Sequence, residues 1–213
     1  METKYPKHEV YEELYKRFFK RKEQELIDLV DIQNGDKVLD VCGGNARLSR
    51  ALLRYTTKVS YLDQEKDMTP IDLEQLGITV YHSSIQDFVK KNEKKYQYVF
   101  CQQAINYWLL SIDIEKFSKL LVKNGVFLFN TFKNKPDTAP MIKEYEIEGK
   151  HYLEISYLVN DKVYHIQMCE GLPPHFTVFD WISEDQYQQL LSPYFEVEKI
   201  TDQKTLIYKC RRK

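Results

Sequence analysis

Five short apolar segments alternate with helix-like segments between residues 38 and 132, and this alternation constrains the fold more than any other feature. Repeated strand-helix order is typical of a parallel sheet with helices on both faces. Two further strand-like segments, 195–200 and 205–210, predict a closing antiparallel hairpin. We therefore expect an α/β fold: a doubly wound, mostly parallel seven-stranded sheet with a C-terminal antiparallel hairpin. The five apolar segments are 38–41, 58–62, 78–81, 98–101 and 126–132.

Helix signals fill the intervals between these segments. Residues 9–31 place apolar side chains on recurring helical faces, and the dipeptide at 34–35 (Asn-Gly) ends this stretch. Ser84 and Ser183 each begin a capping-box pattern. The dipeptide at 69–70 (Thr-Pro) predicts a helix start, because threonine caps well and proline fits the first turn. The expected helices are 9–31, about 46–54, 69–77, one from 84, 111–122 and 183–191.

The pattern changes after Pro136. Residues 145–168 are rich in tyrosine, isoleucine, valine and histidine, with turn signals at 148–149 and 160–161. They predict a small added antiparallel sheet, or lid, after the fifth strand, followed by a rigid link at GLPPHF. We interpret the chain, 1–213, as one domain with a helical cap at 1–34 and the added sheet at 137–180.

Composition argues against several classes of protein. The formal net charge of -1 disfavours a domain built to hold a nucleic-acid backbone. No apolar run approaches the roughly 18 to 20 residues that span a bilayer, and METKYPKHEV lacks the apolar core of a signal peptide. The four cysteines lie far apart without metal-ligand spacing, so we expect no metal site and a reduced, cytoplasmic protein.

Polar residues follow four of the predicted strands, at the edge where an open α/β sheet binds its ligands. The loop Asp40 to Asn45 contains adjacent glycines in a chain with only seven, which indicates a need for backbone freedom. Asp63 ends the second strand, where a carboxylate suits a ribose diol. The other two strand ends offer Ser83, Ser84 and Ile85, and then Gln102 and Gln103.

The glycine spacing selects between two nucleotide-binding patterns. A dinucleotide motif requires G-x-G-x-x-G directly after the strand, and this chain has only the pair Gly43 and Gly44. The order strand, Asp and glycine loop resembles class I S-adenosylmethionine-dependent methyltransferases of the small-molecule type. The resemblance extends from about Asp36 to Cys210 and rests on VLDVCGGNARLSRAL, YLDQEKDM, SSIQDF, YQYVFCQQAINYW, LVKNGVFLFNTF and FDWISEDQYQQLLSPYFEVEKI.

This resemblance implies S-adenosylmethionine as cofactor and S-adenosylhomocysteine as product. It implies that Asp40 orients the glycine loop and the cofactor amino group, and that Gly44 faces the cofactor. Asp63 would hold both ribose hydroxyls, Gln64 would lie beside the adenine, and Gln102 would line the methionine end. The implied cofactor-binding residues are Asp40, Cys42, Gly43, Gly44, Asp63, Gln64, Ser84, Ile85, Gln102 and Tyr15.

Three positions depart from the family pattern. Cys42 and Ala46 replace the first and third glycines of the loop. Both are small, so close approach to a ligand is retained if neither position needs a positive φ. Ser84 stands where many members have an acid that contacts the adenine amino group, and a hydroxyl accepts that hydrogen bond more weakly. We expect these changes to affect cofactor affinity more than cofactor identity.

The implied reaction is methyl transfer to the nitrogen or oxygen of a small molecule by in-line displacement. Such a reaction depends mainly on alignment and desolvation. A base is needed only for a hydroxyl or a protonated acceptor, and His175 is the first choice because it follows the rigid link. His165 and His151 are further candidates.

Aromatic residues complete the expected site. Tyr107, a second candidate catalytic residue, and Trp108 follow the fourth strand and are expected beside the acceptor. Tyr11 and Tyr15 on the first helix are expected to close over the cofactor carboxylate. An aromatic pocket suits an amine or a flat phenol equally. The expected partner is a small methyl acceptor, with no membrane, and the chain is expected as a monomer or homodimer.

Three other functions remain open. An RNA methyltransferase would show a basic groove beside the pocket. A nicotinamide-dependent oxidoreductase conflicts with the glycine spacing. A degenerate methyltransferase fold that only binds ligands or partners is suggested by Cys42, Ala46 and Ser84. Structural roles also remain for Asp40 as a loop anchor and for His175 as a packed side chain.

Overall fold

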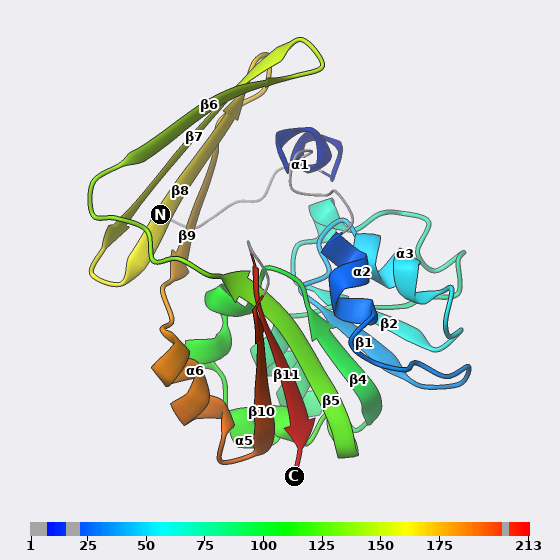
Figure 1. The fold of residues 1–213 in the computed structure, drawn as a ribbon. Helices are drawn as coiled ribbons and strands as arrows, with labels where there is room; N and C mark the ends of the chain where they lie inside the picture. Colours follow the sequence, from blue (N-terminus) through cyan, green and yellow to red (C-terminus); the bar gives the residue numbers. More distant parts are fainter. Residues whose placement is uncertain (1–7, 16–21, 202–204) are drawn as a thin grey trace.

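The computed structural model describes residues 8–15, 22–201 and 205–213, and its centre is a seven-stranded sheet (Figure 1). The strand order is β10-β11-β5-β4-β1-β2-β3. β1 pairs in parallel with β2 and β4, whereas β11 pairs antiparallel with β5 and β10. The predicted fold class is confirmed. The strands are β1 Val38–Val41, β2 Val59–Asp63, β3 Thr79–His82, β4 Tyr96–Cys101, β5 Leu121–Phe132, β10 Phe195–Thr201 and β11 Thr205–Arg212.

The strand order reverses at β1, and this reversal positions the site. The chain runs from β1 outward through β2 and β3, then returns to place β4 and β5 on the other side of β1. Loops after β1 and β4 therefore diverge and leave a crevice at the carboxyl edge of the sheet. All residues of β1 and β2 are buried, as expected for strands covered on both faces.

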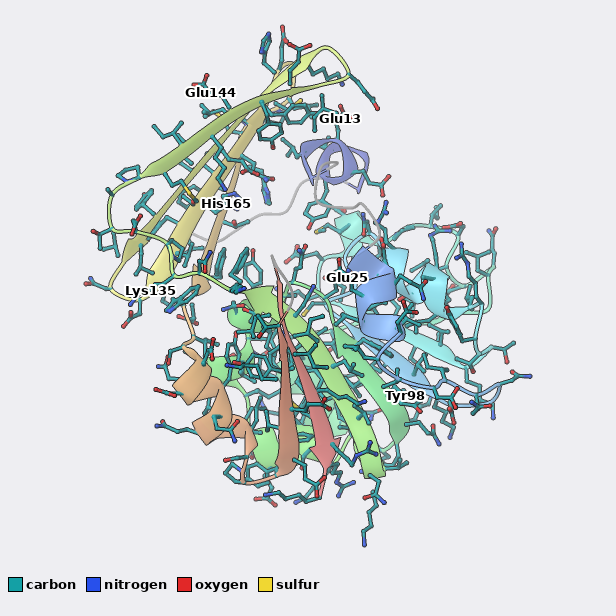
Figure 2. All side chains as sticks on the ribbon, in the orientation of Figure 1. Glu13, Glu25, Tyr98, Lys135, Glu144 and His165 are labelled. Atoms are coloured by element: carbon teal, nitrogen blue, oxygen red, sulfur yellow. The ribbon has the colours of Figure 1, made fainter. Side chains whose placement is uncertain are left out.

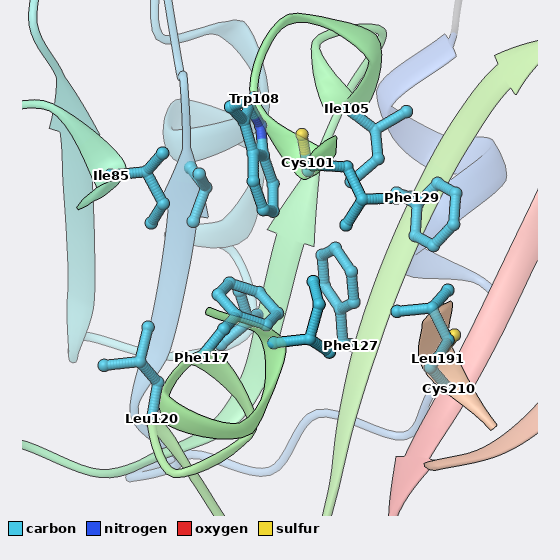
Figure 3. Packing of buried hydrophobic residues seen from close by; sticks show 14 of the residues in the cluster. Ile85, Cys101, Ile105, Trp108, Phe117, Leu120, Phe127, Phe129, Leu191 and Cys210 are labelled. Atoms are coloured by element: carbon cyan, nitrogen blue, oxygen red, sulfur yellow. The ribbon is translucent and has the colours of Figure 1, made fainter. Parts of the chain in front are cut away.

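Two apolar clusters hold helices against the two faces of the sheet. One cluster packs α4, α5 and α6 against the face that bears Phe127 and Phe129 (Figure 3). The other packs α2 and α3 against the face that bears Phe100 and Leu128. The helices are α1 His8–Tyr15, α2 Lys22–Ile27, α3 Arg47–Leu52, α4 Ile85–Lys91, α5 Ile114–Ser118 and α6 Glu184–Leu191.

Serine caps begin two of these helices, and the structure shows the predicted capping box at Ser183 but only the serine cap at Ser84. The Ser183 side chain accepts from the Gln186 amide, and the Gln186 side chain accepts from the Ser183 amide, which completes the capping box of α6. Ser84 caps α4 by accepting from the Asp87 amide at 3.2 Å. The helix predicted at 111–122 is shorter, because Asp113 caps it and Leu121 already pairs with Tyr96 in the sheet.

The helix predicted at 69–77 is wrong. Residues 71–77 form successive turns, and a short 3-10 helix covers Lys66–Met68 instead. The Leu76 amide donates to the Asp72 carbonyl at 3.1 Å, as in an α-helix. The other hydrogen bonds of the Leu76 and Gly77 amides reach carbonyls three residues back, as in a turn. A segment of this length between Pro70 and Gly77 gains too few bonds to offset the cost of helix nucleation.

The added antiparallel sheet is present and has four strands. Tight turns at 148–149 and 160–161, all with positive φ, join its first three strands as predicted. The fourth strand begins at His175, so the expected rigid link is shorter than GLPPHF. The strands are β6 Met141–Ile147, β7 Lys150–Val159, β8 Lys162–Cys169 and β9 His175–Asp180.

Helix α1 lies between the added sheet and the helices α2 and α3 (Figure 1). Leu14 is buried against Tyr152 and Cys169 of the added sheet. Glu13 Oε1 accepts from the Tyr152 hydroxyl at 2.8 Å and from Lys150 Nζ at 3.0 Å. None of the helices within the described residues has the length and apolar character needed to cross a bilayer.

Candidate functional site

A cavity of about 990 Å³ opens at the carboxyl edge of the seven-stranded sheet. It lies at the upper end of the range of small-molecule pockets, roughly 300 to 1,000 Å³. Its walls come from the ends of β1, β2, β3 and β4, from α1 and from the added sheet. Among the residues predicted from sequence, the cavity is lined by Asp40, Cys42, Gly43, Gly44, Asp63, Gln64, Ser84, Ile85, Gln102, Tyr107 and Tyr11.

The glycine loop after β1 is held by the neighbouring strand. The Gly44 amide donates to Asp63 Oδ2 at 2.9 Å, and the Tyr61 hydroxyl donates to the Gly44 carbonyl at 2.7 Å. A Cβ at Gly43 would lie 2.5 Å from the Tyr61 ring and 3.0 Å from Asp40 Oδ2. Gly43 is therefore required by close packing, and the loop presents its backbone to the cavity in a fixed conformation.

Cys42 and Ala46 adopt the left-handed conformation that glycine favours. Their φ values are 55° and 59°, close to the 50° of Gly44. The condition set for these two residues, that neither position needs a positive φ, is therefore not met. A non-glycine residue in this region is destabilised by roughly 1 to 2 kcal/mol, because its Cβ approaches the backbone. The loop therefore keeps the backbone shape of a glycine-rich loop at an energetic cost.

Replacing Ala46 by glycine is expected to change the free energy of unfolding by less than about 1 kcal/mol. Relief of the left-handed strain offsets the loss of a buried methyl group and the larger chain entropy of glycine. Ala51→Gly, inside α3, is the matched control and should destabilise by about 1 kcal/mol. Urea denaturation of both variants tests this, and equal losses of stability would contradict the strain argument.

Two buried carboxylates face the cavity. Burial raises the pKa of Asp40 to about 7, although the Ser49 hydroxyl donates to it at 2.6 Å and opposes the shift. Burial also raises the pKa of Asp63, against hydrogen bonds from the Glu65 and Gly44 amides. Each carboxylate is thus held in a weakly solvated environment that a cation or a hydroxyl donor would stabilise.

Asp63 keeps hydrogen-bonding capacity toward the cavity. Its Oδ1 accepts from the Glu65 amide at 2.8 Å and its Oδ2 from the Gly44 amide at 2.9 Å. Each carboxylate oxygen has two lone pairs, so both atoms retain a site for a further donor. A vicinal diol supplies two such donors at the spacing of the two oxygens.

The end of β4 contributes a second strained turn. Gln103 lines the cavity with a φ of 57°, and its amide donates to Asn130 Oδ1 at 2.6 Å. Asn106 donates to the Asp180 carbonyl at 2.9 Å and accepts from Thr131, so it links this turn to β5 and β9. The sequence does not reveal Asn130 or Asn106, because their partners are distant in the chain.

Aromatic side chains form part of the cavity wall. Tyr107 packs edge-on against Phe179, with centroids 5.4 Å apart, and Phe132 stacks on Phe179 at 5.2 Å. Tyr107 and Phe132 are 38% and 45% exposed, so both present ring surface to a ligand. Tyr107 is a predicted site residue, whereas Phe132 and Phe179 are not and are brought in by the end of β5 and by β9.

His175 is not among the residues that line the cavity. It is buried on β9, and its ring lies 6.4 Å from that of Tyr11. Burial lowers its pKa to about 4, so its neutral imidazole is a weak proton acceptor. His175 begins β9 and pairs with Gln167, two residues along β8 from His165, so it shares the face of His165 but lies further along the sheet, against Tyr11 of α1.

His165 lines the cavity instead, and His151 is exposed where β7 begins. The predicted Tyr15 ends α1, but its side chain lies outside the described part of the chain. α1 is nevertheless attached to the glycine loop, because Asn45 Nδ2 donates to Glu12 Oε1 at 3.0 Å. Tyr11 of the same helix reaches the cavity as predicted.

No protein-family model matches the sequence, and a search of curated proteins also returns no match. Solved structures do match. An S-adenosylmethionine-dependent methyltransferase from Clostridium acetobutylicum is 13% identical, with a TM-score of 0.69 and 96% of each chain covered. A sugar N-methyltransferase from a Streptoalloteichus species is 14% identical, with a TM-score of 0.68 over 100% of this chain and 97% of that chain.

A third similar structure is an amino pentose methyltransferase from Micromonospora echinaspora, solved with S-adenosylmethionine bound. It is 13% identical, with a TM-score of 0.66 and both chains covered completely. At these identities the likeness concerns the fold. The chain has the class I methyltransferase fold, including the closing hairpin and the separate four-stranded sheet.

Proposed function

We propose that the protein transfers the methyl group of S-adenosylmethionine to a nitrogen or oxygen of a small molecule. The observation that carries this proposal is the convergence of four strand ends on one cavity with a fixed glycine loop and two buried carboxylates. The similar sugar methyltransferases support a small acceptor. The protein is further proposed to act inside the cell, on an acceptor that is neither a lipid surface nor a nucleic acid.

The residues present fit the cofactor. Asp63 has lone pairs left for two ribose hydroxyls, and the amides that hold it fix its orientation. Asp40 offers a buried carboxylate for an ammonium group, and a Cβ at Gly44 would meet the Met68 methyl at 3.4 Å, so the backbone here lacks the side chain that would stand between it and a ligand. The Ser84 hydroxyl already caps α4, so the adenine contact proposed for it uses a remaining lone pair.

The cofactor supplies a methyl group already activated by its attachment to a sulfonium. The remaining task of the protein is to hold the acceptor in line and to exclude water. Gln102 and Tyr107, which follow β4, are proposed to lie beside the methyl group, and the Phe132 and Phe179 rings line the same cavity. An apolar face on the acceptor would pack against these rings.

Binding of S-adenosylhomocysteine is expected to strengthen as pH rises toward 7 and to level off above it. Asp40 must lose its proton to pair with the ligand ammonium, and its pKa is raised to about 7. One coupled proton gives up to about tenfold in affinity per pH unit below 7. Calorimetry between pH 5.5 and 8.5 measures this, with Asp40→Asn as the control that should bind weakly and without this pH dependence.

The same pKa shift has the opposite effect on the ligand-free fold. Because the folded pKa of Asp40 lies above the unfolded value of roughly 3.9, its contribution to stability is complete below pH 4. That contribution is lost as pH rises through about 7. The free energy of unfolding of the ligand-free protein is measured against pH for the wild type and for Asp40→Asn. If the wild type gained stability relative to Asp40→Asn as pH rose, the assigned pKa shift would be contradicted.

A methyl-donor assay tests the proposed function. The purified protein is incubated with labelled S-adenosylmethionine and a panel of amines, phenols and amino sugars, with transfer RNA as a further acceptor. We expect turnover with at least one small molecule. Turnover confined to RNA would show that the acceptor class is wrong, and nicotinamide-cofactor binding without S-adenosylhomocysteine binding would favour an oxidoreductase.

A further inference from the structure

His165 lies in the middle of β8, on the inner face of the added sheet (Figure 2). Strand pairing places it between Ser156 of β7 and Thr177 of β9. The Thr177 hydroxyl donates to its carbonyl at 3.4 Å, which ties the backbone here to β9. A side chain on a central strand is positioned more precisely than one on a loop.

The cavity joins this histidine to the predicted methyl-donor end. The same walls contain Gln102 at the end of β4 and His165 on the added sheet. The rings of Tyr107 and Phe179 line the same cavity and pack edge-on against each other. An acceptor seated against these rings is therefore bounded by the glycine-loop side on one face and by the added sheet on the other.

We propose that His165 accepts the proton that the methyl acceptor releases, an inference that rests on the proposed function. In this step the acceptor oxygen or nitrogen forms a bond to the methyl carbon while the carbon-sulfur bond breaks. The electron pair of the broken bond remains on sulfur, which becomes a neutral thioether. The acceptor proton passes to the imidazole, so the positive charge lost by sulfur appears on His165.

Ionisable groups surround His165 from several elements. Gln167 lies two residues along β8 from His165, on the same face. It pairs with Glu154 of β7 and with His175 of β9, and Glu154 pairs in turn with Lys143 of β6. Tyr11 of α1 and Tyr107 line the same cavity. Glu154 is buried, and its Oε1 accepts from Gln167 Nε2 at 2.9 Å.

The test compares His165→Asn with the wild type and with His151→Asn, an exposed histidine of the same sheet. Calorimetry with S-adenosylhomocysteine is measured first, and all three proteins are expected to bind within about threefold of each other. Turnover is then measured from pH 6 to 9 with glucosamine, tyramine and catechol. Failure of the wild type to bind S-adenosylhomocysteine would overturn the proposed function itself and this proposal with it.

For His165→Asn we expect kcat to fall about 100-fold or more, with a much smaller change in KM. The rise of kcat with pH should disappear in this variant and persist in His151→Asn. Added imidazole should restore part of the activity of His165→Ala. If His165→Asn binds S-adenosylhomocysteine normally and keeps kcat within threefold and the same pH profile, His165 does not accept the proton.

Discussion

Replacing Asp63 by asparagine is expected to weaken binding of S-adenosylhomocysteine by about 100-fold or more. The carboxylate would accept two ribose hydroxyls, and hydrogen bonds to a charged group contribute roughly 1.5 to 3 kcal/mol each. Asparagine offers one acceptor oxygen, and its amide group opposes either the Gly44 or the Glu65 amide, both of which are donors. Isothermal calorimetry at pH 8 measures the loss.

Asp67→Asn is the matched control for this experiment. Asp67 is an exposed carboxylate in the 3-10 helix that follows the same strand, four residues after Asp63. Its replacement should leave the dissociation constant within about threefold of the wild-type value. Circular dichroism of both variants establishes that they fold. Equal affinities for Asp63→Asn and the wild type would show that Asp63 does not hold the ribose.

Replacing Gly43 by alanine is expected to lower the free energy of unfolding by about 3 kcal/mol and to abolish cofactor binding. The new Cβ would lie 2.5 Å from the Tyr61 ring, a distance that forces the ring or the loop to move. Overpacking of this kind destabilises by roughly 1 to 3 kcal/mol. Movement of the ring also breaks the hydrogen bond from the Tyr61 hydroxyl to the Gly44 carbonyl.

A double-mutant cycle with Tyr61→Leu isolates the steric cause. Removing the ring in advance should make the Gly43→Ala substitution less costly, with a coupling energy of roughly 1 to 3 kcal/mol from urea denaturation. Additive effects of the two substitutions would contradict the assigned contact. The cycle also separates packing from backbone conformation, because Gly43 is not among the glycines with positive φ.

Most of the fold was predictable from the sequence because its signals are local. Buried strands that alternate with capped helices define the parallel sheet, and the turns at 148–149 and 160–161 define the added hairpins. The capping box at Ser183 forms as its sequence indicates. The helix prediction for 69–77 was wrong, because a good cap and a first-turn proline do not compensate for the short length of this segment.

The wall formed by the central strands was also predictable, because the carboxyl ends of parallel strands meet at one edge. That rule brings Asp40, Asp63, Ser84 and Gln102 to one cavity. The conformation of the glycine loop was not predictable in the same way. Cys42 and Ala46 have side chains that disfavour positive φ, and only the surrounding packing holds them there.

The residues that line the part of the cavity proposed for the methyl acceptor could not be predicted, because they depend on how the added sheet faces the central sheet. The sequence favoured His175 over His165 and His151 because it follows the Pro-Pro link, yet the positions of the three in the added sheet differ. His175 is buried beneath α1, His151 is exposed, and His165 reaches the cavity. Pairing register places His165 and His175 on one face of the added sheet and His151 on the other, and position along the strands then separates His165 from His175.

Calorimetric titration of the wild-type protein with S-adenosylhomocysteine at pH 8 tests the central claim most directly. We predict one binding site per chain, with a dissociation constant in the micromolar range, as a cavity with two buried carboxylates and a fixed glycine loop should provide. Binding should weaken about 100-fold or more in Asp63→Asn. Absence of binding at millimolar S-adenosylhomocysteine and S-adenosylmethionine would contradict the account.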